Sequence, residues 1–176
     1  MSEMNNPLLQ QAEERIESQL TQENKQNYDK IVIAGMHAGL AGGPNSLLAS
    51  LKKSADPISD AAKGAVGVVL VLRKQAQGVM PIKAMVPAAT TLMLHALDFV
   101  DRAKIAKVDN AALVRATHIF TDTIFKALGI TKEGLADAAQ KVHALPQNPE
   151  AMQQINLKAG VVRHPMAPTP TPLPNS

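Results

Sequence analysis

The apolar positions at the start of the chain predict an amphipathic helix. The residues concerned are Leu9, Ala12, Ile16 and Leu20. They recur every three or four positions, which is the repeat of one helix face, and Pro7 stands where a first helical turn tolerates proline. A stripe this narrow is typical of a helix that docks on a partner. We therefore predict that residues 1–30 form an amphipathic arm.

Glycine, proline and capping residues divide the following sequence into further helices. Gly42, Gly43 and Pro44 end the first apolar segment, because glycine terminates a helix and proline does not continue it. Asp56 before Pro57 has the form of an N-cap followed by proline at the first helical position. The predicted helices cover residues 31–41, 46–53, 57–77, 82–106, 111–128 and 131–144.

Other residues mark where these helices begin, end or bend. Asn45 and Asp109 are predicted N-caps for two of them, and Gly129 is a predicted C-terminal stop. Pro87 lies inside the longest one, where it removes a backbone hydrogen bond. We expect that loss to kink the helix near residues 83–84.

The composition changes abruptly after Leu145. Seven of the twelve prolines lie between Pro146 and Pro174, and a run so rich in proline is extended, polyproline-like chain. The sequence thus predicts an all-α fold, built as a helical bundle or as hairpins. Its parts are the acidic amphipathic arm at residues 1–30, a helical core at residues 31–145 and an extended proline-rich tail at residues 146–176.

Three apolar stretches approach the length of a membrane-spanning helix without reaching it. Spanning takes about 20 continuous apolar residues. Ala65–Leu72 provides eight and Ala84–Leu97 fourteen, while Ile31–Leu51 has 21 residues without a formal charge but is interrupted by Gly-Gly-Pro-Asn. Several copies around a pore can satisfy each other's backbone groups. We therefore expect these stretches to need other copies of the chain for shelter.

Composition and charge restrict the function classes. The chain has no cysteine, which excludes disulfides, thiolate metal sites and cysteine nucleophiles. Aromatic residues make up 2%, too few for a platform that stacks single-stranded nucleic acid, so we predict no sequence-specific nucleic-acid binding. Residues 1–30 carry six acids against three bases, and residues 31–80 carry five bases against two acids. One copy's arm on another copy's middle, an acidic partner, or an ordinary solvated surface would each explain this imbalance.

The best arrangement for chemistry pairs a histidine with an aspartate on each of two helices. His95 lies on one helix with Asp98 and Asp101, and His118 lies on the next with Asp122. Spacings of three and four place each pair on one helix face, so two antiparallel helices could present two nitrogens and two oxygens to a metal. Hydrogen bonds along the helix faces explain the same residues more simply. Because nucleophile-elbow and phosphate-loop motifs are also absent, we predict no catalytic residue, no cofactor and no metal.

Small residues recur in the segment that follows the arm. Gly35 and Gly39 form a small-xxx-small pair, which lets two helix backbones approach closely. Such an approach suits contact between copies or within lipid, and it equally suits a tight crossing inside one soluble core. The residues predicted to contact other copies or the membrane are Ile31, Ile33, Gly35, Gly39, Gly42, Val68, Leu70, Leu72, Met85, Leu92 and Leu94.

Two stretches carry a resemblance to a known family. They read Tyr-Asp-Lys-Ile-Val-Ile-Ala-Gly-Met-His-Ala-Gly-Leu over residues 28–40 and Met-Val-Pro-Ala-Ala-Thr-Thr-Leu-Met-Leu-His over residues 85–95. With these stretches, and in style over residues 1–160, the chain resembles the small internal virion proteins, or ejection proteins, of short-tailed bacteriophages. The family is the one that carries a giant virion RNA polymerase. The resemblance implies a helical, non-enzymatic protein that oligomerises into a ring or tube at the host envelope.

The patterning and the resemblance together predict a structural virion protein that is not an enzyme. We expect it to homo-oligomerise into part of a channel through the host envelope for phage genome delivery. Its expected partners are other virion or ejection proteins and the host outer membrane, and its expected location is the virion and, after ejection, the host cell envelope. The main alternative is a soluble helical scaffold or adaptor that binds partners through its arm and tail. A metal-dependent enzyme using the two histidine–aspartate pairs is the third hypothesis.

Overall fold

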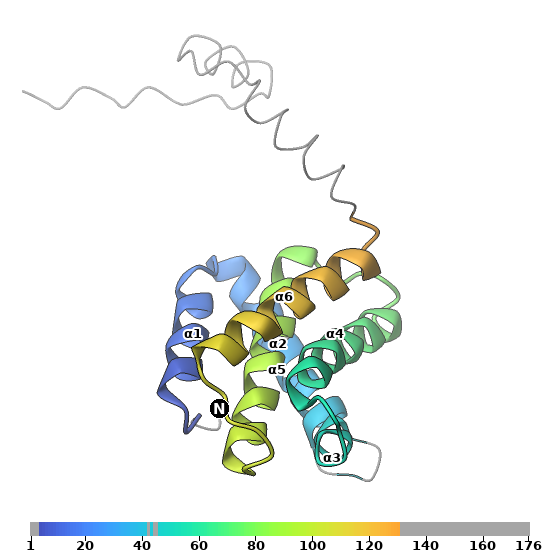
Figure 1. Ribbon diagram of the computed structural model, residues 1–176. Coiled ribbons are helices and arrows are strands. Elements are labelled where there is room, and N and C mark those ends of the chain that lie inside the picture. Colours follow the sequence, from blue (N-terminus) through green and yellow to red (C-terminus); the bar gives the residue numbers. More distant parts are fainter. Residues whose placement is uncertain (1–3, 42, 44–45, 131–176) are drawn as a thin grey trace, which may run out of the picture. The chain divides into compact units, whose positions relative to one another are not determined.

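Two helices separated by a short connection form the start of the chain. The computed structural model describes residues 4–41, 43 and 46–130, and within them the chain forms only helices and connections (Figure 1). Helix α1 covers Pro7–Ser18, and the Asn6 side chain caps it by accepting a hydrogen bond from the Leu8 N–H. Helix α2 covers Gln22–Gly35. The all-α fold is confirmed, and the predicted arm boundary at residue 30 falls inside α2.

The apolar segment that begins at Ile31 ends in a π-helical turn. Helix α2 passes directly into this turn, η1, over Met36–Leu40, and the short helix α3 covers Leu47–Leu51. The prediction of Asn45 as the cap of α3 is wrong. Ser46 is the N-cap, because its hydroxyl accepts a hydrogen bond from the Ala49 N–H at 3.2 Å.

Three longer helices complete the described part of the chain. Helix α4 covers Pro57–Gln75, α5 covers Ile82–Arg102 and α6 covers Asn110–Ala127. The predicted N-caps of α4 and α6 are confirmed, since the carboxylates of Asp56 and Asp109 accept backbone hydrogen bonds in the first turns. The predicted helix over 131–144 and the predicted tail over 146–176 lie outside the described residues, as does Gly42.

Backbone geometry explains where two of these helices end. Gly129 has φ 69° after α6, the left-handed conformation that glycine adopts without strain, which confirms it as the C-terminal stop. Lys104 takes the same conformation, with φ 55°, and so α5 ends at Arg102 rather than near residue 106. Helix α5 nevertheless continues through Pro87, whose ring nitrogen has no hydrogen to donate to the Lys83 carbonyl.

Helix α5 is the central element of the bundle. In Figure 1, α1 lies to its left and α4 to its right, and its most extensive packing is with α4 and α2. Helix α6 packs on α4. Thirteen of the 21 residues of α5 are buried, many of them alanine, which lets the neighbouring helices approach closely.

The three apolar stretches have their buried residues inside one copy of the chain. The stretch Ala84–Leu97 lies within α5, and most of its residues are buried. The prediction that the stretches need other copies for shelter is therefore wrong for Ala84–Leu97. No helix among residues 4–41 and 46–130 is long and apolar enough to cross a membrane. The buried members of the other two stretches include Ile31, Val32, Leu40, Leu51, Ala65, Val66 and Val69.

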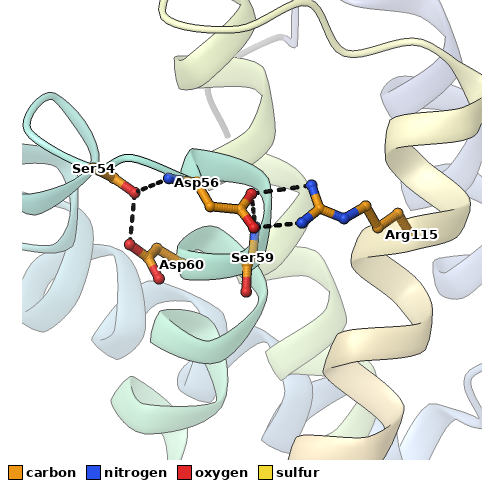
Figure 2. Close-up of polar contacts among 5 residues, drawn as sticks. All are labelled: Ser54, Asp56, Ser59, Asp60 and Arg115. Carbon is orange, nitrogen blue, oxygen red and sulfur yellow. Dashed lines mark hydrogen bonds and ion pairs between the residues drawn. The ribbon is translucent and has the colours of Figure 1, made fainter.

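An ion pair fixes the start of α4 to α6. Both terminal nitrogens of Arg115 donate to the Asp56 carboxylate, as Figure 2 shows. The Asp56 carboxylate also accepts from the Ser59 N–H at 3.3 Å, and Ser54 bridges to Asp60 with its hydroxyl 2.6 Å from the Asp60 carboxylate. The hydrogen bond from Arg115 lowers the pKa of Asp56 below its ordinary value. Because the pair is exposed, we assign it an orienting role rather than a large contribution to stability.

Candidate functional site

A stripe of polar side chains runs along one face of α5, within an otherwise apolar core. It consists of Thr91, His95, Asp98 and Asp101, which we call the α5 seam. The first three are buried, with exposed fractions of 0%, 9% and 2%. Burying a polar group is costly unless it has a hydrogen-bond partner. The partners of the seam therefore indicate what it does.

The seam contacts α2 through the only tyrosine of the chain. The Tyr28 hydroxyl lies 2.8 Å from the Thr91 hydroxyl in the buried interface between α2 and α5. Burial raises the pKa of Tyr28 to about 12, because the phenolate form would lose its hydration. This pair positions two helices and holds the tyrosine as a neutral phenol.

The seam contacts α1 through a histidine and a glutamate. The His95 Nε2 lies 3.1 Å from the Glu13 Oε1, and both side chains are mostly buried. No donor of standard hydrogen-bond geometry reaches this Glu13 oxygen, although the separation fits an ion pair. The contact is attractive only when Nε2 carries a proton. It holds the middle of α1 against α5.

Two aspartates fix the N-terminal segment to the last turns of α5. One Asp98 oxygen accepts hydrogen bonds from the Asn5 and Asn6 N–H groups at 2.9 and 3.2 Å. The other oxygen of Asp98 is 2.9 Å from the Arg102 Nε. Asp101 accepts a hydrogen bond from the Asn6 side-chain amide at 2.9 Å. The seam therefore docks the arm on the same chain, where the sequence alone favoured docking on a partner.

The candidate metal-binding residues do not meet. His95 and Asp98 lie in the seam, whereas His118 and Asp122 are exposed on α6. No three histidine, aspartate or glutamate side chains converge on a metal-sized site within the described ranges. Within the seam, His95 contacts Glu13 on α1, and Asp98 binds the Asn5 and Asn6 N–H groups and Arg102.

A cavity of about 280 Å³ lies beside the seam. Its apolar wall comes from η1, α3 and α5, and its polar edge includes His95, Asp98 and Arg102. His95 is paired with Glu13, and Asp98 with Arg102 and two backbone N–H groups. His95 and Asp98 are thus engaged in contacts within the bundle, and the third titratable group of the lining, the exposed His37, comes from η1. The geometry suits structural support better than acid–base catalysis.

Most of the predicted contact residues lie inside the bundle. Gly35 and Gly39 sit at tight in-chain crossings, where an added Cβ would collide with Leu92 on α5 and with Val68 on α4. The alternative of a crossing within one soluble core thus applies to both glycines. Ile33 is the exception, with 56% of its surface exposed. The structure buries Ile31, Gly35, Gly39, Met85, Leu92 and Leu94 and half-buries Val68, Leu70 and Leu72.

Some important residues gave no usable signal in the sequence. Asn5 and Glu13 are partners of the seam, yet nothing in their local spacing pointed to α5. Val79 and Ile82, in contrast, belong to an apolar region but have 83% and 49% of their surface exposed. They lie where α4 connects to α5, at the break that the sequence predicted between residues 77 and 82, but nothing in the sequence predicted that these two side chains would be exposed.

The chain matches no protein-family model, no curated protein and no solved structure in the comparisons. Its function is therefore inferred from its residues and their arrangement.

Proposed function

We propose that this chain is a non-enzymatic structural protein of a phage virion, which homo-oligomerises to form part of the route for the genome through the host envelope. The observation that carries the non-enzymatic role is the use made of the buried ionisable side chains. Among the described residues these are Tyr28, His95 and Asp98, and each one joins helices of the same chain. The phage setting is supported by the sequence resemblance.

Contacts between copies would use exposed aliphatic residues rather than the buried ones. Ile33 on α2 and Val114 on α6 expose about half of their surfaces, at 56% and 49%. Exposed aliphatic residues on separate helices give a chain more than one contact face, which ring or tube assembly requires. A second copy would therefore join through these faces while each bundle stays folded.

The oligomeric mass of the purified full chain in buffer and in mild detergent tests this proposal. We expect a defined multiple of 18.7 kDa in at least one condition. Ile33→Asp and Val114→Asp should each reduce that multiple, whereas Asp122→Ala on the exposed face of α6 should leave it unchanged. A monomer at all concentrations in both solvents, without leakage of dye from vesicles, would contradict the channel role.

A soluble scaffold or adaptor is the second candidate. The burial of most of Ala84–Leu97 within one bundle favours it, because a self-contained bundle needs no lipid. Removing residues 165–176 discriminates between the two roles. An adaptor that uses its tail would lose its protein partner, whereas a channel component would still oligomerise.

A further inference from the structure

Three exposed aliphatic side chains belong to the segment that ends α4, connects it to α5 and begins α5. We call residues 71–83 the hairpin end, which Figure 1 shows as the end of α4, a green loop at the edge of the bundle and the start of α5. Val71, Val79 and Ile82 have 54%, 83% and 49% of their surfaces exposed. They are three of the five large apolar residues that the described part of the chain leaves exposed. Exposed apolar patches mark interaction surfaces.

The charged residues within this segment are all basic. Between residues 61 and 97 the sequence has four basic residues and no acidic one. Three of the four, Arg73, Lys74 and Lys83, lie in the hairpin end itself. Lys74 and Lys83 are exposed. The hairpin end therefore carries apolar side chains and cations side by side, with no carboxylate of its own to neutralise them.

Backbone hydrogen bonds give the hairpin end a defined conformation. The Gly78 N–H donates to the Arg73 carbonyl at 3.0 Å, and the Gln77 N–H donates to the Lys74 carbonyl at 3.1 Å. These two bonds form the capping motif in which residues after a helix turn into the left-handed region, as the φ values of 51° for Gln77 and 80° for Gly78 confirm. The cap ends α4 sharply and leaves Val79 pointing away from the core.

We propose that the hairpin end inserts its aliphatic side chains into the interfacial region of an anionic lipid bilayer, while its three cations pair with lipid headgroups. Apolar side chains beside lysine and arginine are what interfacial binding requires. Such insertion is shallow, so it needs no helix of spanning length. The inference rests on the proposed role at the envelope, for which it names the contacting surface and the partner.

A tryptophan reporter tests the insertion directly, because the chain contains no tryptophan. The full chain is prepared as Val79→Trp and, as a control, as Gln10→Trp, which replaces an exposed uncharged residue on α1. Each variant is titrated with vesicles of phosphatidylcholine alone and with vesicles that contain phosphatidylglycerol. We expect a blue shift of the emission, and quenching by brominated lipid, only for Val79→Trp and only with the anionic vesicles.

Removing charge gives the second readout. The triple variant Arg73→Gln, Lys74→Gln, Lys83→Gln should bind anionic vesicles on the order of a hundredfold more weakly, at about fivefold for each cation lost. Circular dichroism of each variant shows whether the bundle remains folded. An unchanged emission of Val79→Trp with anionic vesicles, or equal shifts for both reporters, overturns the inference. A shift that grows with protein concentration in the absence of lipid also overturns it, because the surface then belongs to a second copy.

The result is separable from the test of the proposed channel. A chain that binds vesicles through the hairpin end but neither oligomerises nor releases dye refutes the channel and supports the lipid-binding surface. A chain that oligomerises and releases dye, without a shift at position 79, refutes only the surface.

Discussion

The two ends of α5 reverse the usual distribution of polar and apolar residues. Toward its C-terminus, the seam buries a histidine and an aspartate in the interior of the bundle. At its N-terminus, the hairpin end leaves Val79 and Ile82 in solvent. Hydrogen bonds of Thr91 with α2 and of Asp98 with the N-terminal segment lower the cost of burying the seam, and His95 faces Glu13 on α1. At the hairpin end Leu72 and Met80 pack against the core, whereas Val71, Val79 and Ile82 remain exposed.

This difference indicates which end serves stability and which serves recognition. A satisfied buried network fixes the positions of helices, and its loss leaves donors and acceptors without partners. Exposed aliphatic residues contribute little to folding, so substitutions there change binding and spare the fold. Variants at the two ends of α5 should therefore separate stability from binding.

The largest expected effect follows from removing the buried carboxylate of the seam, that of Asp98. Asp98→Ala leaves the Asn5 and Asn6 N–H groups and Arg102 without their acceptor. We expect a loss of about 3 kcal/mol in the free energy of unfolding, measured by urea denaturation. Asp122→Ala, on the exposed face of α6, is the control and should change stability by less than about 0.5 kcal/mol. Equal effects of the two substitutions would show that the seam does not hold the arm.

The next effect is a pH dependence at the tyrosine of the seam. Burial raises the pKa of Tyr28 from 10.0 to about 12, so the folded state holds the proton more tightly than the unfolded state. This contribution to stability is complete below pH 10 and is lost as the pH rises to 12, amounting to about 2 kcal/mol. Because Tyr28 is the only tyrosine, the ultraviolet absorbance of its phenolate reports it alone. Titration near pH 10 in the folded protein would contradict the buried pair, and Tyr28→Phe should remove the absorbance change.

Two glycines test how closely η1 packs against α4, the helix that ends in the hairpin end. Gly39→Ala brings a methyl group against Val68 on α4, and we expect a loss of about 1–3 kcal/mol. Gly67→Ala, on the open face of α4, meets nothing and should stabilise by about 0.5–1 kcal/mol through its helix propensity. Thermal unfolding of both variants provides the measurement. The same sign for both would mean that Gly39 is not at a tight crossing.

The smallest effect concerns the cap of the hairpin end. Gln77 has φ 51°, a conformation that costs a residue with a side chain more than it costs glycine. Gln77→Gly should therefore stabilise the chain by about 0.5 kcal/mol, after the larger entropy loss of glycine is included. Lys104→Gly, at the equivalent position after α5, should behave alike, whereas Gln75→Gly within α4 should destabilise. A lower unfolding temperature for Gln77→Gly would show that its side chain stabilises the cap.

Local signals in the sequence predicted the helices well. Pro57 after Asp56, Asp109 and Gly129 mark helix ends through backbone hydrogen bonds that involve only neighbouring residues. The errors at helix ends are the choice of Asn45 over the adjacent Ser46, the end of α5 placed near residue 106 instead of at Arg102, and a boundary at residue 30 that falls inside α2. Capping chemistry is short-range, so a single sequence reveals it.

The sequence predicted only part of the candidate site, because the site depends on contacts between residues that are far apart in the chain. The spacing of His95 and Asp98 showed one polar helix face, but their partners Glu13 and Asn5 are more than 80 residues away in the chain. The sequence alone does not show that α1 packs on α5, so His95 and Asp98 were consistent both with a metal site and with a set of hydrogen bonds. The glycines were ambiguous in the same way, since Gly35 permits a close approach by any helix.

The sequence by itself determined that the described chain is helical and where most of its helices start and stop, because propensities and caps act between near neighbours. Only the tertiary structure decided that the arm docks on its own α5, that most of Ala84–Leu97 is buried within one copy, and that Val79 and Ile82 remain outside. Burial depends on which helices meet across the chain, and hydrophobicity along the sequence does not specify those neighbours.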